Sequence, residues 1–556
     1  MTEAADRLFV NGEIHTLAAP DETHEAVAVR DGAVVRLGST RDVEFLEGVD
    51  TDVVDLDGRV LLPGFVDAHT HLTTVGRYLV HADLSTAGSP SEAVDLLADR
   101  AAALEDADPD GSADPGDPVL GYGYDESTWD ETRYLTRTDL DRVSTERPVA
   151  AFREDMHVAA VNGVALDRFA DALAAAPDET VPTDERGEPT GVLLESAIDP
   201  IYEAFESGPA ETREIVEAAL ADCAAKGITG FHDMVRNSHA PRVYRELDAA
   251  GELTARVRIN YWSDHLDALR EVGLTTDHGS DMVETGAIKS YTDGSFGGRT
   301  ARLSEPYADD PDERGQWVVD PDELAATVTA ATEAGYQFTA HAIGDEAVDA
   351  VLDAYEGASS ADPGEARHRI EHVEIADDAA IDRLAESGVV ASVQPNFLKW
   401  AGEDGLYEAR LGPERTAATN RYRDMLDAGV RLAFGSDGMP MDPLVGVHHA
   451  VNAPAAAQRL TVTEALRAYT RGAAYAGFDE DRLGTVAVGK RADLVALDAS
   501  PWARSDAIRD IDVALTVVDG EVIRVRQRDG RLEWESTTDA EATIRRLLRL
   551  DDDLAA

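Results

Sequence analysis

The chain has 556 residues, of which 43% are apolar, and it carries 109 acidic against 50 basic side chains for a formal net charge of -59. That length exceeds one ordinary domain and favours a large barrel of about 250 residues or more with smaller additions. The charge excludes nucleic acid and anionic membranes as expected partners, because an acidic surface repels both.

The composition also predicts a cellular setting. Acidic residues are spread along the whole chain, a pattern typical of halophilic proteins whose carboxylates stay hydrated in concentrated salt. The single cysteine, Cys223, cannot form an intramolecular disulfide, which fits a reducing cytoplasm. The first residues lack the features of a signal peptide, and no apolar stretch approaches the roughly 20 residues of a membrane span. We therefore expect a cytoplasmic protein.

Both ends of the chain are predicted to be rich in β-strands. Short apolar runs over residues 8–62 are broken by turn signals at Asn11-Gly12 and Asp31-Gly32. Residues 484–527 repeat the pattern around Asp519-Gly520. We expect one small β-sandwich domain built from residues 1–60 and 480–530.

The middle of the chain alternates helix and strand. Expected helices at 211–226, 322–334 and 377–387 each stop at a glycine that precedes an apolar run. This alternation is typical of a parallel sheet or barrel. We therefore expect an α/β fold, a (β/α)8 TIM barrel over residues 61–479, with strands near 61–66, 228–232, 257–262, 286–291, 337–341, 368–372, 389–394 and 432–436.

Residues 75–205 interrupt this alternation after the first barrel strand. Apolar runs at 119–124 and 148–152 predict an inserted subdomain, in which residues 106–118 form an acidic loop rich in proline and glycine. A charged C-terminal tail, 531–556, follows the second half of the sandwich, with a helix expected around 539–550.

Two histidines at the end of an apolar strand give the first chemical signal. His69 and His71 are two residues apart, so on a strand their imidazoles face the same side. Such a pair can bind one zinc-like ion. Taken alone, the motif fits two surface histidines at a strand end equally well.

Other strand ends add further candidate ligands. His341, His372 and Asp437 each follow an apolar run at the carboxyl end of an expected strand, where barrel enzymes hold their active sites. Lys289 lies inside another apolar strand, a costly position unless the amine is paired or modified. Each residue alone fits a polar core position, but five strand ends that converge on one barrel mouth favour a shared metal site.

The order of these elements resembles the amidohydrolase superfamily over nearly the whole chain. The segment that runs from Gly58 to His71 is similar to the first barrel strand of that superfamily, and Gly435-Ser-Asp437 is similar to its last metal strand. Amidohydrolase family 3, the branch of N-substituted formamide deformylases, is most similar in four segments: Gly121-Tyr-Gly-Tyr-Asp125, Arg153 to Asn162, Lys289 to Ser295, and His341-Ala-Ile-Gly-Asp345. Tyr122 and Tyr124 replace tryptophans of that branch, which predicts an altered pocket wall.

The resemblance implies a divalent metal cofactor, expected to be Zn²⁺, as one or two ions. His69, His71 and Asp437 would hold the first ion, His341 and His372 the second, and a carboxylated Lys289 would bridge them. Asp437 would be the catalytic residue. It would accept a proton from the metal-activated water and deliver that proton to the leaving nitrogen. Related enzymes are often dimers, so a homodimer is one expected assembly.

The implied activity is hydrolysis of a C–N bond, in an amide, N-formyl or N-acyl group of a small molecule. The same metal site could instead act on a cyclic amide, a deaminated ring or an ester. A degenerate barrel that only binds or regulates is the alternative outside enzymes. Candidate substrate contacts are His157, Asp125, Asp293 and Arg299, although Asp293 and Arg299 could equally pair with each other.

Overall fold

A computed structural model describes residues 3–19, 21–106, 117–154, 157–177, 180–358, 363–526 and 534–535. The chain divides into two compact units: Thr73–Ala219 forms one, and the residues up to Leu72 and from Leu220 form the other. The predicted tail helix at 539–550 and most of the predicted loop at 106–118 lie outside the described residues.

The larger unit contains a sheet of eight parallel strands in the order β20-β19-β18-β17-β16-β15-β14-β8. The backbone N–H groups of Ser436 and Asp437 donate to the carbonyl of His69 at 3.1 and 2.8 Å, which joins the last strand to the first. This arrangement confirms the predicted (β/α)8 fold. The strands are β8 (Phe65–Thr70), β14 (Ile228–Val235), β15 (Arg256–Trp262), β16 (Val283–Ser290), β17 (Phe338–Ala342), β18 (Arg369–His372), β19 (Val390–Val393) and β20 (Arg431–Phe434).

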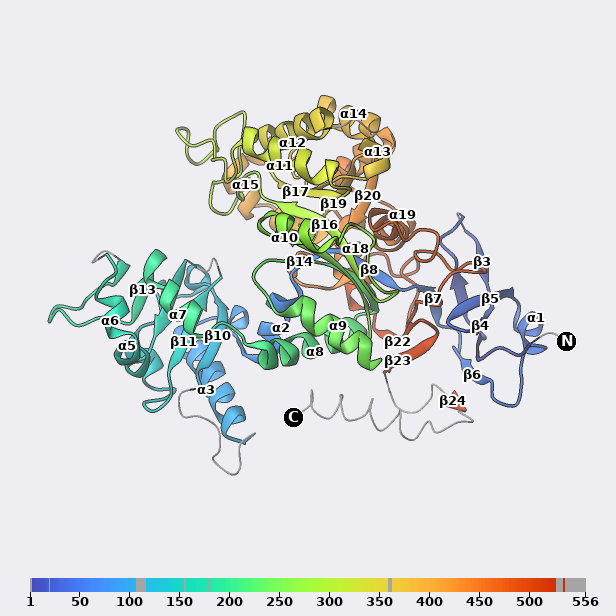
Figure 1. The fold of residues 1–556 in the computed structure, drawn as a ribbon, viewed down its shortest axis with the longest axis horizontal. Helices are drawn as coiled ribbons and strands as arrows, with labels where there is room; N and C mark the ends of the chain where they lie inside the picture. The colour runs from blue at the N-terminus through green and yellow to red at the C-terminus, as the bar shows by residue number, and fades with distance from the viewer. Residues whose placement is uncertain are drawn as a thin grey trace. The chain divides into compact units, whose positions relative to one another are not determined.

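Helices follow the barrel strands and cover them from outside. The helices α11 (Pro321–Glu333), α12 (Asp345–Ala358) and α14 (Asp378–Ser387) lie side by side, and α11 and α12 pack on β17 (Figure 1). α14 ends at Gly388, whose φ of 69° is the left-handed conformation that glycine adopts readily. Because the barrel strands are covered in this way, they are buried almost throughout and read as continuous apolar runs.

The strand predicted at 61–66 is wrong, because this apolar run belongs to two strands. β7 (Val60–Pro63) pairs with β21 (Leu494–Leu497) in the sandwich, and β8 begins only at Phe65. Gly64 joins them, and a Cβ there would lie 2.2 Å from the hydroxyl oxygen of Thr229. Apolar periodicity cannot detect such a crossing from one sheet to another, since both strands are buried.

Strands from both ends of the chain form the sandwich. One sheet has the order β24-β6-β1-β4-β5 and the other has the order β23-β22-β21-β7-β2-β3. Their remaining strands are β1 (Arg7–Val10), β2 (Glu13–His15), β3 (Thr23–His24), β4 (Ala26–Arg30), β5 (Ala33–Gly38), β6 (Asp52–Asp55), β22 (Val513–Val518), β23 (Glu521–Val525) and β24 (Trp534–Glu535). Buried side chains such as Phe9, Ile14 and Val517 fill the space between them.

The smaller unit is built on a five-stranded sheet of its own. Its order is β13-β12-β11-β10-β9, and α3 (Pro90–Asp106) packs on β10. Tyr122 stacks on Phe152 and Tyr124 on Trp129, and all four side chains are buried in the core. The two tyrosines are therefore core residues of this unit. Its strands are β9 (Ala82–Asp83), β10 (Val119–Tyr124), β11 (Val149–Arg153), β12 (Val158–Val161) and β13 (Val192–Leu194).

None of the helices in the described ranges combines the length and apolar character needed to cross a membrane.

Candidate metal centre

Three candidate ligands from different strands meet at the carboxyl end of the barrel. One ligand atom each of His69, His372 and Asp437 lies within 4.8 Å of the other two. The Nε2 atoms of His69 and His71 are each 3.4 Å from Oδ1 of Asp437. This proximity follows from the barrel closure, because the residues after β20 pair with the backbone of His69.

His341 lies next to this group, and the backbone uses one of its two ring nitrogens. Its ring centroid is 4.5 Å from that of His372, and its Nε2 donates to the carbonyl of Gly294 at 2.9 Å. Only Nδ1 of His341 therefore remains as a ligand atom. The Nδ1 of His372 is buried and has no hydrogen-bond partner among the described residues. Such an orphaned nitrogen is what an ion would satisfy.

Lys289 is buried at the same place without a compensating carboxylate contact. It is 1% exposed, and the described residues give its amine no hydrogen bond or ion pair within 4.0 Å. Its Nζ lies 6.0 Å from the centre of the Trp262 ring. Burial lowers the pKa of Lys289 to about 8, although Glu371 and Asp437 oppose this shift. The amine can therefore lose its charge near neutral pH.

Burial lowers the pKa of His71, His341 and His372 and so favours their neutral imidazoles. Burial would also lower the pKa of His69, but the charges of Glu371 and Asp437 raise it. Burial, followed by the charge of Lys289, lowers the pKa of His341 to about 3. Burial would raise the pKa of Asp437, but the nearby imidazoles, that of His69 first, hold it well below its usual range. Neutral imidazole and carboxylate are the protonation states that bind metal.

The backbone is strained at two of these positions. His372 has a φ of 76° and Asp437 has a φ of 56°, left-handed values that non-glycine residues adopt at a cost of about 1–3 kcal/mol each. On a regular strand Glu371 and His372 would face opposite sides. The left-handed turn brings both toward His69, at a hydrogen-bond distance of 2.6 Å for Glu371 and a ring separation of 5.1 Å for His372.

Comparison with known families identifies the group to which this chain belongs. A sequence profile described as the amidohydrolase family matches residues 52–524. The chain belongs to the amidohydrolase family, in its family 3 branch. The predicted resemblance is thus confirmed.

Relatives and solved structures align with nearly the whole of this chain. The protein YtcJ of Bacillus subtilis, which carries an amidohydrolase name, is 32% identical over 93% of this chain and 99% of its own. N-substituted formamide deformylase of Arthrobacter pascens is 27% identical over 94% and 98%. A metal-dependent hydrolase of Pyrococcus furiosus superposes with a TM-score of 0.74 at 29% identity, over 89% and 99%. These similarities show that the chain is a hydrolase, and they support the binding of a divalent metal ion.

The structure also brings charged residues to the centre that the sequence did not single out. Glu371 accepts a hydrogen bond from Nδ1 of His69, and Arg369 pairs with Glu371 at 2.7 Å. Asp67 accepts from the backbone N–H groups of His69 at 3.1 Å and Ser436 at 3.0 Å. Their signal was present in the sequence, since Asp67 shares a strand face with His69, and two charges within the apolar strand β18 require partners.

Asp293 and Arg299, predicted to contact substrate, have other partners in the amidohydrolase. The Asp293 carboxylate is fully buried and accepts from the backbone N–H groups of Arg302, Ile343 and Gly344. Burial raises the pKa of Asp293 to about 7. Arg299 pairs with Asp309 through two nitrogens, so its suggested pairing with Asp293 is wrong. Substrate contact by either residue stays a prediction.

The other two predicted substrate contacts belong to the smaller unit. His157 is exposed and lies 3.0 Å from a carboxylate oxygen of Glu195. Asp125 accepts from the backbone N–H of Ser127 and pairs with Arg153 at 3.2 Å. Both have local partners within their own unit, and their contact with substrate stays a prediction.

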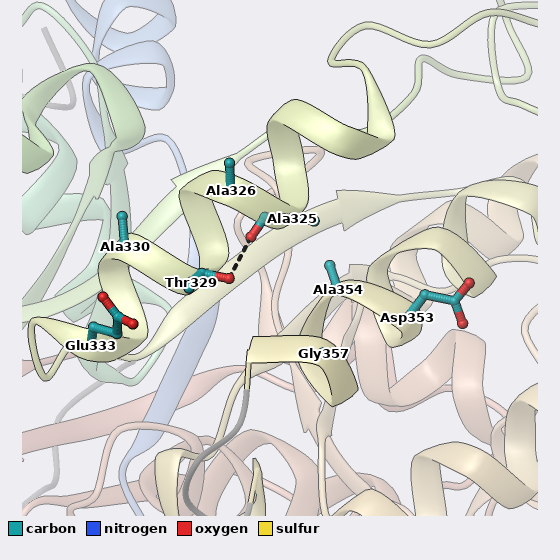
Figure 2. Close-up of a pocket in the computed structure, with 8 residues that line it drawn as sticks. All are labelled: Ala325, Ala326, Thr329, Ala330, Glu333, Asp353, Ala354 and Gly357. Carbon is teal, nitrogen blue, oxygen red and sulfur yellow. Dashed lines mark hydrogen bonds between the residues drawn. The ribbon is translucent and has the colours of Figure 1, made fainter.

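A separate cleft of about 500 Å³ opens between α11 and α12. Figure 2 shows its small side chains, with the Thr329 hydroxyl bonded to the carbonyl of Ala325. Glu333 and Asp353 are its only charged lining residues in the described chain, and none of its residues is a candidate ligand. The candidate ligands thus lie at the strand ends and not in this cleft.

Proposed function

We propose that this amidohydrolase cleaves a C–N bond in an amide, N-formyl or N-acyl group of a small molecule. The main observation that supports this proposal is the buried cluster of His69, His372 and Asp437 at the carboxyl end of the barrel. The name of the Arthrobacter relative, a formamide deformylase, supports this bond type. Hydrolysis of a cyclic amide, ring deamination and ester hydrolysis by the same site are the alternatives.

The donor set fits a divalent ion, and we propose Zn²⁺. Imidazole nitrogen and carboxylate oxygen are suitable zinc donors, and the orphaned Nδ1 of His372 is consistent with a missing ligand. His69, His71 and Asp437 would hold one ion, and His341 and His372 a second. When bound, such ions activate water and polarise a carbonyl group.

We also propose that Lys289 is carboxylated on its amine. A buried lysine with no carboxylate against it is costly as an ammonium ion, whereas the carbamate is an anion with two oxygens for neighbouring ions. Removal of the carbamate would leave an unmodified lysine and a site for one ion.

Asp437 has the properties of the proton carrier. Its carboxylate is ionised because imidazoles surround it, so it can accept a proton from the attacking water. Delivery of that proton to the leaving nitrogen returns Asp437 to its starting state. Trp262 and Tyr291 stand edge to face at 5.1 Å, and the Tyr291 ring is 5.1 Å from that of His341. These rings provide an apolar wall beside the reacting atoms.

A substrate panel tests this proposal. N-formyl and N-acyl amines, a cyclic amide, an aminated ring and an ester are incubated with protein prepared in high salt, with and without a chelator. We expect amine release that the chelator abolishes and zinc restores. Turnover of another panel member alone would favour an alternative bond, and no turnover with any would favour a barrel that only binds.

We further propose a setting of concentrated salt in a reducing cytoplasm. The net charge of -59 and the single cysteine support it, because self-repulsion of carboxylates weakens as salt shortens the Debye length. Unfolding midpoints measured across a KCl series should rise with salt. A midpoint independent of salt would contradict this setting. We also expect a homodimer, and a sedimentation measurement of the molecular mass would test this assembly.

A further inference from the structure

Glu371 connects a candidate metal ligand to a second buried charge. Its Oε2 accepts from Nδ1 of His69 at 2.6 Å, where the side chains are 0% and 1% exposed. Its Oε1 faces Nη2 of Arg369 at 2.7 Å and accepts from the hydroxyl of Thr339. Both carboxylate oxygens of Glu371 therefore have partners within the barrel.

Arg369 is itself held by several strands. Its Nη1 donates to Nδ1 of His232 on β14 at 2.8 Å, and its Nη2 donates to the hydroxyl of Ser392 on β19 at 2.9 Å. Nη2 also donates to the carbonyl of Ala68 on β8. The guanidinium thus has a fixed position inside the barrel, and it fixes the carboxylate of Glu371 in turn.

This geometry determines which nitrogen of His69 carries the proton. A carboxylate that accepts at Nδ1 requires a proton there, which in the neutral imidazole leaves the lone pair on Nε2. Nε2 is the atom that lies 3.4 Å from Asp437 in the candidate centre. The opposite tautomer would place a proton on Nε2, where it would block an ion.

We propose that Glu371 is a positioning residue that holds His69 in the tautomer competent to bind metal, and that Arg369 keeps Glu371 in place. The inference rests on the proposed role of His69 as a metal ligand. A buried ion pair seldom stabilises a fold more than apolar packing does. Because Glu371 contacts His69, a proposed metal ligand, this ion pair has a role in positioning that ligand in addition to any contribution to stability.

A second buried ion pair in the same unit provides a matched control. Arg256 binds Asp493 through two nitrogens at 2.7 and 3.0 Å, and the two side chains are 8% and 6% exposed. Neither residue contacts a candidate ligand in the described structure. Loss of this pair therefore reports the effect of breaking a buried ion pair without touching the metal centre.

The test compares Glu371→Gln with Asp493→Asn in the full chain. Metal is removed, and Zn²⁺ affinity is measured by competition with a chromogenic chelator, beside the free energy of unfolding of the metal-free protein. Glutamine keeps the shape, but its amide can donate to Nδ1 and stabilise the wrong tautomer. We expect Glu371→Gln to weaken Zn²⁺ binding by about 10- to 100-fold. Asp493→Asn should destabilise the fold and leave the affinity unchanged.

Two results would overturn the inference: unchanged affinity in Glu371→Gln, or an equal loss of affinity in both variants. If circular dichroism shows that Glu371→Gln does not fold, Thr339→Val replaces it, because that change removes one hydrogen bond from the same carboxylate. A smaller loss of affinity in Thr339→Val supports the inference, and no loss overturns it. A wild-type protein that binds no zinc would remove the proposed function first, which distinguishes the two failures.

Discussion

The two ends of the barrel both bury charged side chains, but they satisfy them differently. At the amino ends of the strands, Arg258 is 4% exposed and faces Asp277, Glu284 and Asp479 at 2.7, 2.5 and 3.3 Å. At the carboxyl ends, Lys289 meets no carboxylate at such a distance in the described chain, and Nδ1 of His372 has no partner.

This difference distinguishes an end of the barrel with a structural role from the end that we propose binds metal. Three carboxylates meet the guanidinium charge of Arg258 within the protein, although its Nε has no hydrogen-bond partner among the described residues, and this favours a structural role for the amino end. At the carboxyl end the amine of Lys289 has no opposing carboxylate within 4.0 Å among the described residues, which favours a ligand or a modification there. The strained φ values of His372 and Asp437 occur at the same end. The comparison predicts that substitutions at the two ends affect different quantities.

The largest effect is expected from Asp437→Asn. The substitution keeps the shape but removes both the charge that attracts the ion and the proton acceptor, so kcat/KM should fall by about 10²- to 10⁴-fold. Asp493→Asn, at the amino end, should lower the free energy of unfolding and leave kcat/KM nearly unchanged. Hydrolysis rates and urea unfolding measure both. An Asp437→Asn variant with full hydrolytic activity would contradict the proposed difference between the two ends of the barrel.

Gly435→Ala should damage the carboxyl end through sterics alone. A Cβ at this position would lie 2.5 Å from the backbone nitrogen of His69 and 2.7 Å from its Cβ. We expect overpacking to reduce stability by about 1–3 kcal/mol and to displace His69, with loss of zinc affinity. Gly402→Ala is the control, since a Cβ there meets nothing within 4 Å. Equal zinc titrations for the two variants would contradict the account.

Acid should destabilise the metal-free protein through its buried neutral histidines. Burial lowers the pKa of His368 to about 4 from an ordinary 6.5. The unfolded chain therefore binds protons that the folded chain refuses. The contribution to stability is complete above pH 6.5 and declines as pH falls from 6.5 toward 4.

His368→Asn isolates this contribution. Its side-chain oxygen can still accept from the backbone N–H of Phe338, as Nδ1 of His368 does at 3.0 Å. Between pH 7 and pH 5 the variant should lose about 2 kcal/mol less stability than the wild type. Urea unfolding at both pH values is the measurement, and identical losses would show that His368 does not titrate as described.

The smallest effect is expected on the outer surface. Arg383 forms ion pairs with Asp349, Asp353 and Glu356 at 2.6–3.1 Å, and all three carboxylates are exposed. Solvent screens such pairs, so Arg383→Ala should change the free energy of unfolding by less than about 1 kcal/mol. Activity should stay constant. A larger loss would mean that surface pairs matter as much as the buried ones.

Sequence patterns predicted those features that depend on local order. Helix stops such as Gly388 and polar residues after apolar runs, such as Asp437, placed the barrel strands and the candidate ligands. The run at 61–66 failed because burial on both sides gives two different sheets the same apolar pattern. Glu371 escaped notice because its partner His69 lies 302 residues away, and only the closed barrel brings them together.

The zinc content of the full chain, purified in concentrated salt and measured by elemental analysis beside Asp437→Asn, tests the central claim most directly. The account predicts tightly bound zinc in the wild type, chelator-sensitive hydrolysis, and loss of both in the variant. A wild-type protein that holds no metal, with hydrolysis unaffected by chelators, would contradict the assignment of the incomplete carboxyl end as a metal centre.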